Sequence, residues 1–149
     1  MNLLEGILDS IDKLKKRVSR LESQGAPRWV MLAVPLTSTS WDGDARSTTA
    51  KTVIDLSAVF GVPAGVRAVL LSVGLRDVAS AGGDYILILS PNDVDVQGLG
   101  TRVSGLPNDS YHNETHIIPC SATGDIYYQI AASGAGTMDI YLEIWGYLI

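Results

Sequence analysis

The sequence predicts a mainly β protein, in which a short N-terminal coiled-coil helix (residues 1–25) precedes an eight-stranded antiparallel β-sandwich (residues 26–149). Apolar residues follow a seven-residue repeat up to residue 21. Beyond residue 25 no helical period appears, and apolar runs of strand length alternate with clusters of Gly, Pro, Asn, Asp and Ser. Eight short strands in one domain of ordinary size favour a jelly-roll-like sandwich.

The N-terminal repeat has the spacing of a coiled coil. Its apolar residues are separated alternately by three and four positions, and a period of 3.5 stays buried only where helices wind around one another. The alternative is an amphipathic helix lying on its own domain, which normally carries a wider apolar stripe. Asn2 and Glu5 can cap the helix, and Gly25 and Pro27 end it. The seam residues are Leu4, Ile7, Ile11, Leu14, Val18 and Leu21.

Three helices are favoured over two. Leu4 and Ile7 depart from the residue types typical of two-stranded coils at the a and d positions. Residues 17–22, Arg-Val-Ser-Arg-Leu-Glu, resemble a signature of three-stranded coiled coils, which implies that Arg17 pairs with Glu22 of a neighbouring helix. We therefore predict a homotrimer whose contacts are the seam, Arg17 and Glu22.

Composition narrows the possible partners. The formal net charge is −5, made up of +1 in the coil and −6 in residues 26–149, so we expect no nucleic-acid binding. No run approaches the ~18 apolar residues of a membrane span, and the N-terminal apolar residues are periodic rather than grouped as in a signal peptide. We expect a soluble protein made in the cytoplasm. The single cysteine, Cys120, is expected to be a small buried residue.

Several predicted strands are apolar on both faces, for example at residues 68–73 and 86–89. In an isolated sandwich one face of each sheet is exposed to solvent and should be polar. The additional apolar faces of these strands are therefore candidates for burial between subunits. The last two strands are expected to pair as a hairpin through residues 133–136, with alternate residues of 126–130 facing those of 140–144 in the core. The predicted strands are Trp29–Pro35, Lys51–Ser57, Val66–Asp77, Tyr85–Ser90, Thr101–Val103, Thr115–Ser121, Ile126–Ala132 and Thr137–Leu148.

The sequence carries no recognisable catalytic or cofactor motif, and we expect no enzyme, no cofactor and no metal site. His112 and His116 flank Glu114, but turn residues surround them, and on a strand the two histidines would lie roughly 13 Å apart. A polar loop is the preferred interpretation. The acidic turns at residues 42–44 and 92–95 suit weak calcium binding, although Asx-type turns explain both without an ion.

Aromatic residues are the strongest candidates for binding. If the last two strands pair, Tyr127, Tyr141 and Trp145 share one outer sheet face, where they can fill an oligomer interface or stack on sugar rings. The interface is favoured because the coil already predicts self-association. Trp41, in a polar loop, is a second candidate contact point.

A short coil followed by a sandwich resembles the trimeric structural proteins of bacteriophage virions, and the segments 53–57, 62–69 and 144–149 are similar to pieces of such proteins. The resemblance implies a non-enzymatic homotrimer in the virion, attached to other capsid or tail proteins as a fibre, spike or decoration component. The alternative is a trimeric receptor- or carbohydrate-binding module that uses the surface aromatics to contact a host molecule. A trimer of sandwiches is also similar to tumour-necrosis-factor and complement-like heads. A cellular trimeric adaptor with no role in a virus is therefore a third hypothesis.

Overall fold

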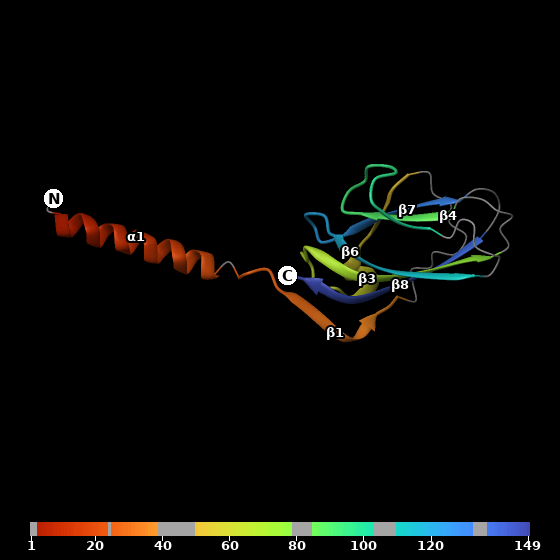
Figure 1. Ribbon diagram of the computed structural model, residues 1–149, viewed down its shortest axis with the longest axis horizontal. Coiled ribbons are helices and arrows are strands. Elements are labelled where there is room, and N and C mark those ends of the chain that lie inside the picture. Colours follow the sequence, from red (N-terminus) through yellow and green to blue (C-terminus); the bar gives the residue numbers. More distant parts are fainter. Residues whose placement is uncertain (1–2, 24, 39–49, 79–84, 103–109, 133–136) are drawn as a thin grey trace.

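Two four-stranded sheets lie face to face, and a long helix, α1 (Leu3–Ser23), projects from one end of them (Figure 1). The computed structural model describes residues 3–23, 25–38, 50–78, 85–102, 110–132 and 137–149. The prediction of a mainly β protein with eight antiparallel strands and one long N-terminal helix is confirmed. The remaining elements are β1 (Trp29–Leu36), β2 (Thr52–Ile54), α2 (Leu56–Phe60), β3 (Ala68–Val78), β4 (Tyr85–Ser90), β5 (Leu99–Arg102), β6 (Tyr111–Pro119), β7 (Ile126–Ala132) and β8 (Thr137–Leu148).

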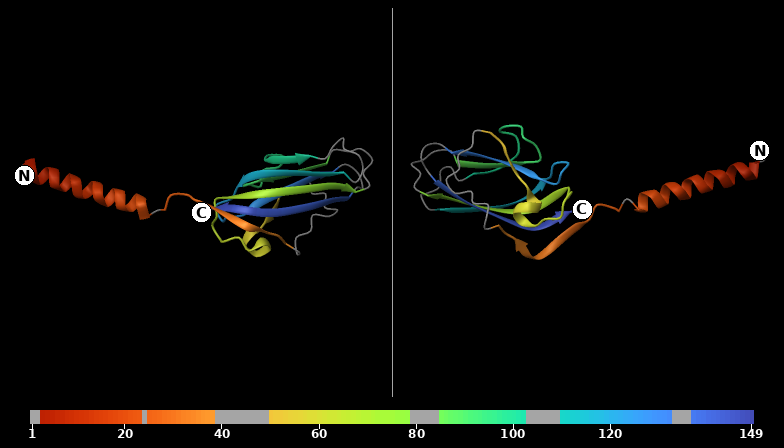
Figure 2. Two further views of the ribbon diagram at one scale, coloured as in Figure 1. Left: turned by 60° about the horizontal axis from the view of Figure 1, so that its bottom comes forward. Right: turned by 180° about the vertical axis from the view of Figure 1, so that it is seen from behind.

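The strand order is β1-β8-β3-β6 in one sheet, which we call sheet A, and β2-β7-β4-β5 in the other, sheet B. Every ladder joins one of the strands β1–β4 to one of the strands β5–β8, and each is antiparallel. Figure 2 shows the two layers from two further sides, with α1 extending away from both. Apart from the consecutive strands β4 and β5, the neighbouring strands in each sheet are distant in sequence.

The core lies between the sheets and is filled by alternate residues of the long strands. On β3 the inward positions are Val69, Leu71, Val73 and Leu75, all fully buried. Leu56 and Phe60 of α2 close one side of the same cluster. The other strands contribute Ile54, Leu87, Leu89, Ile118, Ile126, Tyr128, Ile130, Ile140, Leu142 and Ile144.

The predicted hairpin of the last two strands is wrong. The alternation within 126–130 and 140–144 correctly identifies the buried residues, but β7 pairs with β2 and β4, whereas β8 pairs with β1 and β3. The two apolar faces meet across the interior instead of along a shared ladder. The alternation of apolar and polar residues predicts which side of a strand faces the core, but it does not predict which strand lies beside it. The proposed turn at 133–136 lies outside the described residues.

Two further boundaries differ from the prediction by three residues or more. The strand expected at Lys51–Ser57 ends at Ile54, because the Asp55 carboxylate accepts a hydrogen bond from the Ala58 backbone N–H at 2.9 Å and caps α2. The strand expected from Thr115 begins at Tyr111, so the 112–116 segment belongs to a strand and not to a polar loop.

Residues near the start and at the end of the sandwich, Arg28 and Ile149, are paired at the end of the body that faces α1. The backbone N–H of Arg28 donates to the Ile149 carbonyl, and the N–H of Ile149 donates back to the Arg28 carbonyl, both at 3.1 Å. In Figure 1 the C-terminus accordingly lies next to the start of β1, at the end of the body that faces α1. This pair of bonds fixes the point at which α1 joins the sheets.

Candidate oligomer interface

The heptad seam of α1 is exposed along its described length. Helix α1 projects from the sheets (Figure 1), so neither sheet covers its apolar side chains. Their exposed fractions range from 40% at Ile11 to 64% at Leu4, with Ile7, Leu14 and Val18 between these values. Leu21 and Glu22 lie in the last turn of the helix. The pairing of Arg17 with Glu22 of a second chain stays a prediction.

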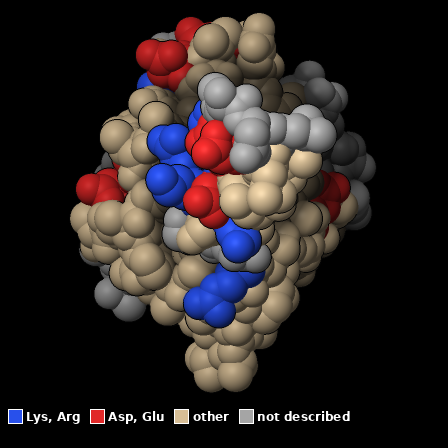
Figure 3. All heavy atoms as spheres, turned by 90° about the vertical axis from the view of Figure 1, so that its left-hand side faces the viewer, with Lys and Arg blue, Asp and Glu red and all other residues tan. Residues whose placement is uncertain are grey.

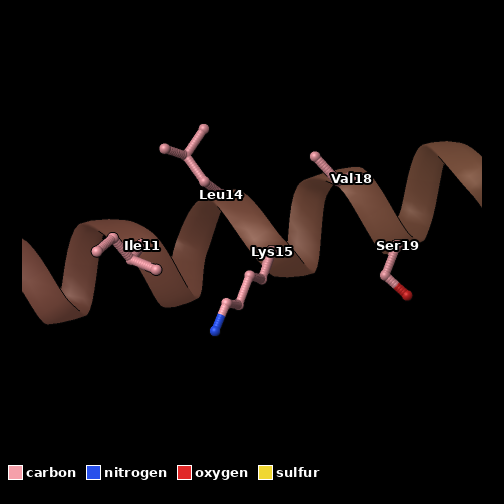
Figure 4. A pocket seen from close by; sticks show the side chains of 5 residues that line it. All are labelled: Ile11, Leu14, Lys15, Val18 and Ser19. Carbon is pink, nitrogen blue, oxygen red and sulfur yellow. The ribbon is translucent and has the colours of Figure 1, made fainter.

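A groove runs along the middle of this seam, lined by Ile11, Leu14, Lys15, Val18 and Ser19. Figure 4 shows Leu14 and Val18 pointing from the same side of the ribbon, one turn apart. Residues at i, i+3, i+4 and i+7, here 11, 14, 15 and 18, form the four-sided hole that receives one side chain of a partner helix in knobs-into-holes packing. The groove therefore has the composition and spacing of a site for a second helix.

The rest of α1 is polar and suited to water. Lys13 and Asp9 form an ion pair at 2.7 Å across one helical turn, with both side chains largely exposed. Seen along α1 towards the body, basic and acidic side chains lie close together in the centre of the view, and further acidic groups lie near its edges with uncharged surface between them (Figure 3). Only one side of α1 is thus apolar, as an assembly helix requires.

The aromatic candidates do not share one sheet face, so this prediction is wrong. Tyr127 points outward from sheet B, whereas Tyr141 and Trp145 are exposed on the outer face of sheet A, on the opposite side of the sandwich. The error follows from the incorrect pairing of β7 with β8. Trp41 lies outside the described residues.

The outer face of sheet B is covered in part by its own chain. Gln129 points outward from β7 yet is buried, because its side-chain oxygen accepts a hydrogen bond from the Val96 backbone N–H at 2.7 Å and its amide reaches Asp95. The Asp95 carboxylate also accepts the Lys51 backbone N–H at 3.0 Å. The Asn92 side chain accepts the Val94 N–H, as expected for an Asx turn. The segment 91–98 therefore lies over sheet B.

A row of polar side chains lies on the inner side of β6, at the open edge of the sandwich. Glu114 bonds His112 through one carboxylate oxygen at 2.8 Å and His116 through the other at 3.1 Å. The hydroxyl of Thr101 on β5 lies 2.8 Å from the same His116 nitrogen and joins the two sheets. The hydrogen bond from His112 is the main reason that the pKa of Glu114 lies below its ordinary value.

Replacing Glu114 by Gln is expected to destabilise the fold at pH 7 by about 1 kcal/mol or less, since solvent screens this half-exposed pair. A lowered folded-state pKa contributes stability above the ordinary carboxyl value of 4.5, and this is lost as pH falls through the lowered value. Urea unfolding of both proteins at several pH values should show their difference closing in acid. An equal difference at pH 7 and pH 3 would contradict this account, and Asp93→Asn, on an exposed loop, is the control.

The single cysteine is predicted to be unreactive. Burial raises the pKa of the Cys120 thiol from 9.0 to about 12, and its side chain packs against the core. Because the thiolate is the reacting species, alkylation at pH 8 should be slower than in urea by about two to three powers of ten. Val53→Cys, at a half-exposed position of β2, should react at nearly the unfolded rate. Rapid labelling of Cys120 in the folded chain would contradict the prediction.

A polar and aromatic cluster lies on sheet A towards the end that is remote from α1. The Arg76 guanidinium on β3 is paired with Asp139 on β8, and it lies 5.3 Å from the ring centroid of Tyr111 on β6. Tyr111 and Tyr141 are both exposed. The sequence interpretation did not include Tyr111, because it placed the start of β6 four residues too late; strand alternation extended back through 111–115 would have found it.

The described part of the chain contains no group of three or more His, Cys, Asp or Glu side chains placed to hold a metal ion. Among its described residues, neither helix combines the length and apolar character that crossing a bilayer requires. Compared with known proteins, the sequence matches no protein-family model and no curated protein.

Proposed function

We propose that this protein is a non-enzymatic homotrimer that serves as a structural component of a bacteriophage virion, in a capsid or tail fibre, spike or decoration. The observation that carries the proposal is the exposed heptad seam on a helix that projects from the body. A row of apolar residues at a period of 3.5 has no stabilising role on a lone helix in water, whereas it drives association with copies of itself. Self-association is then the primary property of the chain.

The topology of the body supports a virion protein. The orders β1-β8-β3-β6 and β2-β7-β4-β5 are those expected of an eight-stranded jelly roll, in which two Greek keys are folded into two facing sheets. Viral capsid proteins and lectins are frequent users of this arrangement. We therefore propose a jelly-roll body carried by a trimeric stem, attached to other capsid or tail proteins and made in the host cytoplasm.

Light scattering on the full chain tests the assembly. Across micromolar concentrations we expect three times the chain mass of 15.9 kDa. A single-chain mass would overturn the proposal, and twice the chain mass would replace the trimer by a dimer. Mass spectrometry of purified phage particles tests the location, because a structural component must be present there in fixed stoichiometry, whereas a cellular adaptor would be absent.

Receptor or carbohydrate binding is the second candidate function, favoured by the cluster on sheet A. Tyr111 and Tyr141 offer exposed rings, and the Arg76–Asp139 pair offers donors and acceptors beside them. Sugar rings are recognised by this combination of an aromatic surface with polar groups at its border. The cluster lies towards the end of the body remote from the stem, where a host surface is accessible.

A glycan array distinguishes the two candidates. Specific binding that is lost in Tyr141→Ala and kept in Tyr127→Ala, on the opposite face, would support a receptor-binding module. Trp145→Ala and Trp41→Ala extend the test to the remaining aromatic candidates. Absence of binding to any glycan or host cell, together with a trimeric mass, leaves the structural role.

A further inference from the structure

The strand β1 is an uninterrupted apolar segment at the edge of sheet A. Its eight residues, Trp-Val-Met-Leu-Ala-Val-Pro-Leu, include no charged side chain. Met31 and Val34 are 62% and 75% exposed, which is unusual for apolar residues of a strand. Exposed apolar edge strands are prone to pair with other chains, and soluble proteins interrupt them with charges or cover them. We therefore expect this apolar edge to be covered by another protein surface.

The exposed surface continues from β1 onto the neighbouring strand. A Cβ atom placed on Gly146 of β8 would lie 3.1 Å from the Met31 sulfur and 2.9 Å from the Val30 carbonyl oxygen, so Met31 lies directly over this glycine. Trp145, exposed at the register shift of β8, adjoins it. In Figure 3 the lowest part of the molecule, where Figure 1 places β1, carries no charged residue. We call the exposed apolar residues Trp29, Met31, Val34 and Trp145 the β1 patch; Val34 lies in the irregular part of β1 between Met31 and Leu36.

Pro35 and the register shift of β1 disfavour the addition of a strand along the second half of this edge. The ladder with β8 runs over Trp29–Met31 and resumes at Leu36. Pro35 has no N–H to donate to a further strand. We therefore expect a partner to cover the side chains of the patch instead of adding a strand along the whole edge.

The position of the patch along the chain identifies the partner. Only five residues, 24–28, separate α1 from β1, and five extended residues reach roughly 18 Å at most. Helices that associate through the α1 seam must therefore bring the β1 strands of all copies close to one axis. Part of the outer face of sheet B is covered by the 91–98 segment of its own chain, although Val94 and Val96 of that segment are themselves exposed.

We propose that a second copy of this chain covers the β1 patch, so that the bodies as well as the stems are joined in the assembly. The inference rests on the proposed self-association through α1. A coil of three heptads is only about 30 Å long, and isolated short helices are marginal in water. Contact between the bodies next to the stem adds apolar burial where the coil ends.

Thiol labelling of the full chain tests the contact. Val34→Cys places a thiol in the patch, and Val53→Cys places one on β2, in the opposite sheet, at a 50% exposed position. Each is combined with Leu14→Asp, which is designed to break the stem. A bulky maleimide should label position 34 at least about tenfold more slowly than position 53 in the assembled chain, and equally fast once the stem is broken. Light scattering on the same samples reports the assembly.

The outcomes separate this inference from the proposed function. A trimeric mass with equal labelling at positions 34 and 53 overturns the body contact and leaves the stem intact. A monomeric mass for the unaltered chain overturns the proposed function itself. As a second measure, Val34→Lys should weaken assembly by more than about tenfold, whereas Val53→Lys should leave it unchanged; equal effects of the two would contradict the proposal.

Discussion

Leu14→Asp is expected to convert the proposed trimer into single chains. Leu14 lines the middle of the α1 groove, where a side chain from a neighbouring helix would be seated. Each copy loses about 2 kcal/mol of apolar burial, and the three carboxylates face one another near the axis. The burial loss alone, about 6 kcal/mol per trimer, lowers the association constant by about four powers of ten.

The control for this variant is Asp12→Lys, on the water-facing side of α1. It changes the charge by two units without entering the seam, so the trimeric mass should persist. Because α1 projects away from the sheets, the Leu14→Asp chain should keep its β-sheet circular dichroism. A trimer that survived Leu14→Asp would show that the seam is not the main contact.

Gly124→Ala is expected to be one of the most damaging single-methyl changes in the body. Gly124 has φ +92°, and a Cβ there would lie 2.7 Å from the Gly65 backbone nitrogen and 3.1 Å from that of Val66. The left-handed backbone and the clash with main-chain atoms together should cost about 2–5 kcal/mol of the free energy of unfolding. The turn also supports α2, because the Asp125 carboxylate accepts the Leu56 N–H at 3.3 Å.

Gly61→Ala separates the two contributions. Gly61 has φ +73° at the end of α2, and among the described residues no atom outside its own stretch of chain lies within 4 Å of the position of an added Cβ. Gly61→Ala should therefore lower the free energy of unfolding by only about 1 kcal/mol, through backbone strain alone. Both variants are compared by urea unfolding in the Leu14→Asp background, where stability does not depend on chain concentration. Equal losses would show that the turn relaxes around the methyl group.

The sequence could predict the elements of this fold better than their partners. The strong alternation in residues 126–130 and 140–144 identified the buried side of each strand correctly. It could not place the two strands in different sheets, because that choice depends on contacts between residues far apart in the chain. The short helix after Asp55 was missed since a single turn is too brief to show a helical period.

In the candidate oligomer interface too, features that depend on local sequence were predicted better than features that depend on strand pairing. The seam residues were assigned from their spacing alone, since a helical repeat is local, and the structure places the described ones on one exposed stripe. The grouping of Tyr127 with Tyr141 and Trp145 depended on strand pairing, and it failed with the pairing. The patch of Met31 and Val34 could not be read from the sequence, because an apolar strand at a sheet edge resembles one in the middle.

The paired backbone bonds between Arg28 and Ile149 have a practical consequence for anyone who labels this molecule. A fluorophore or fusion partner added after Ile149 would emerge at the end of the body that faces α1, where it would crowd the proposed assembly. The remote end of the sandwich would stay far from such a tag. Reporters meant to watch contact with a host surface are better attached to a side chain there than to the chain end.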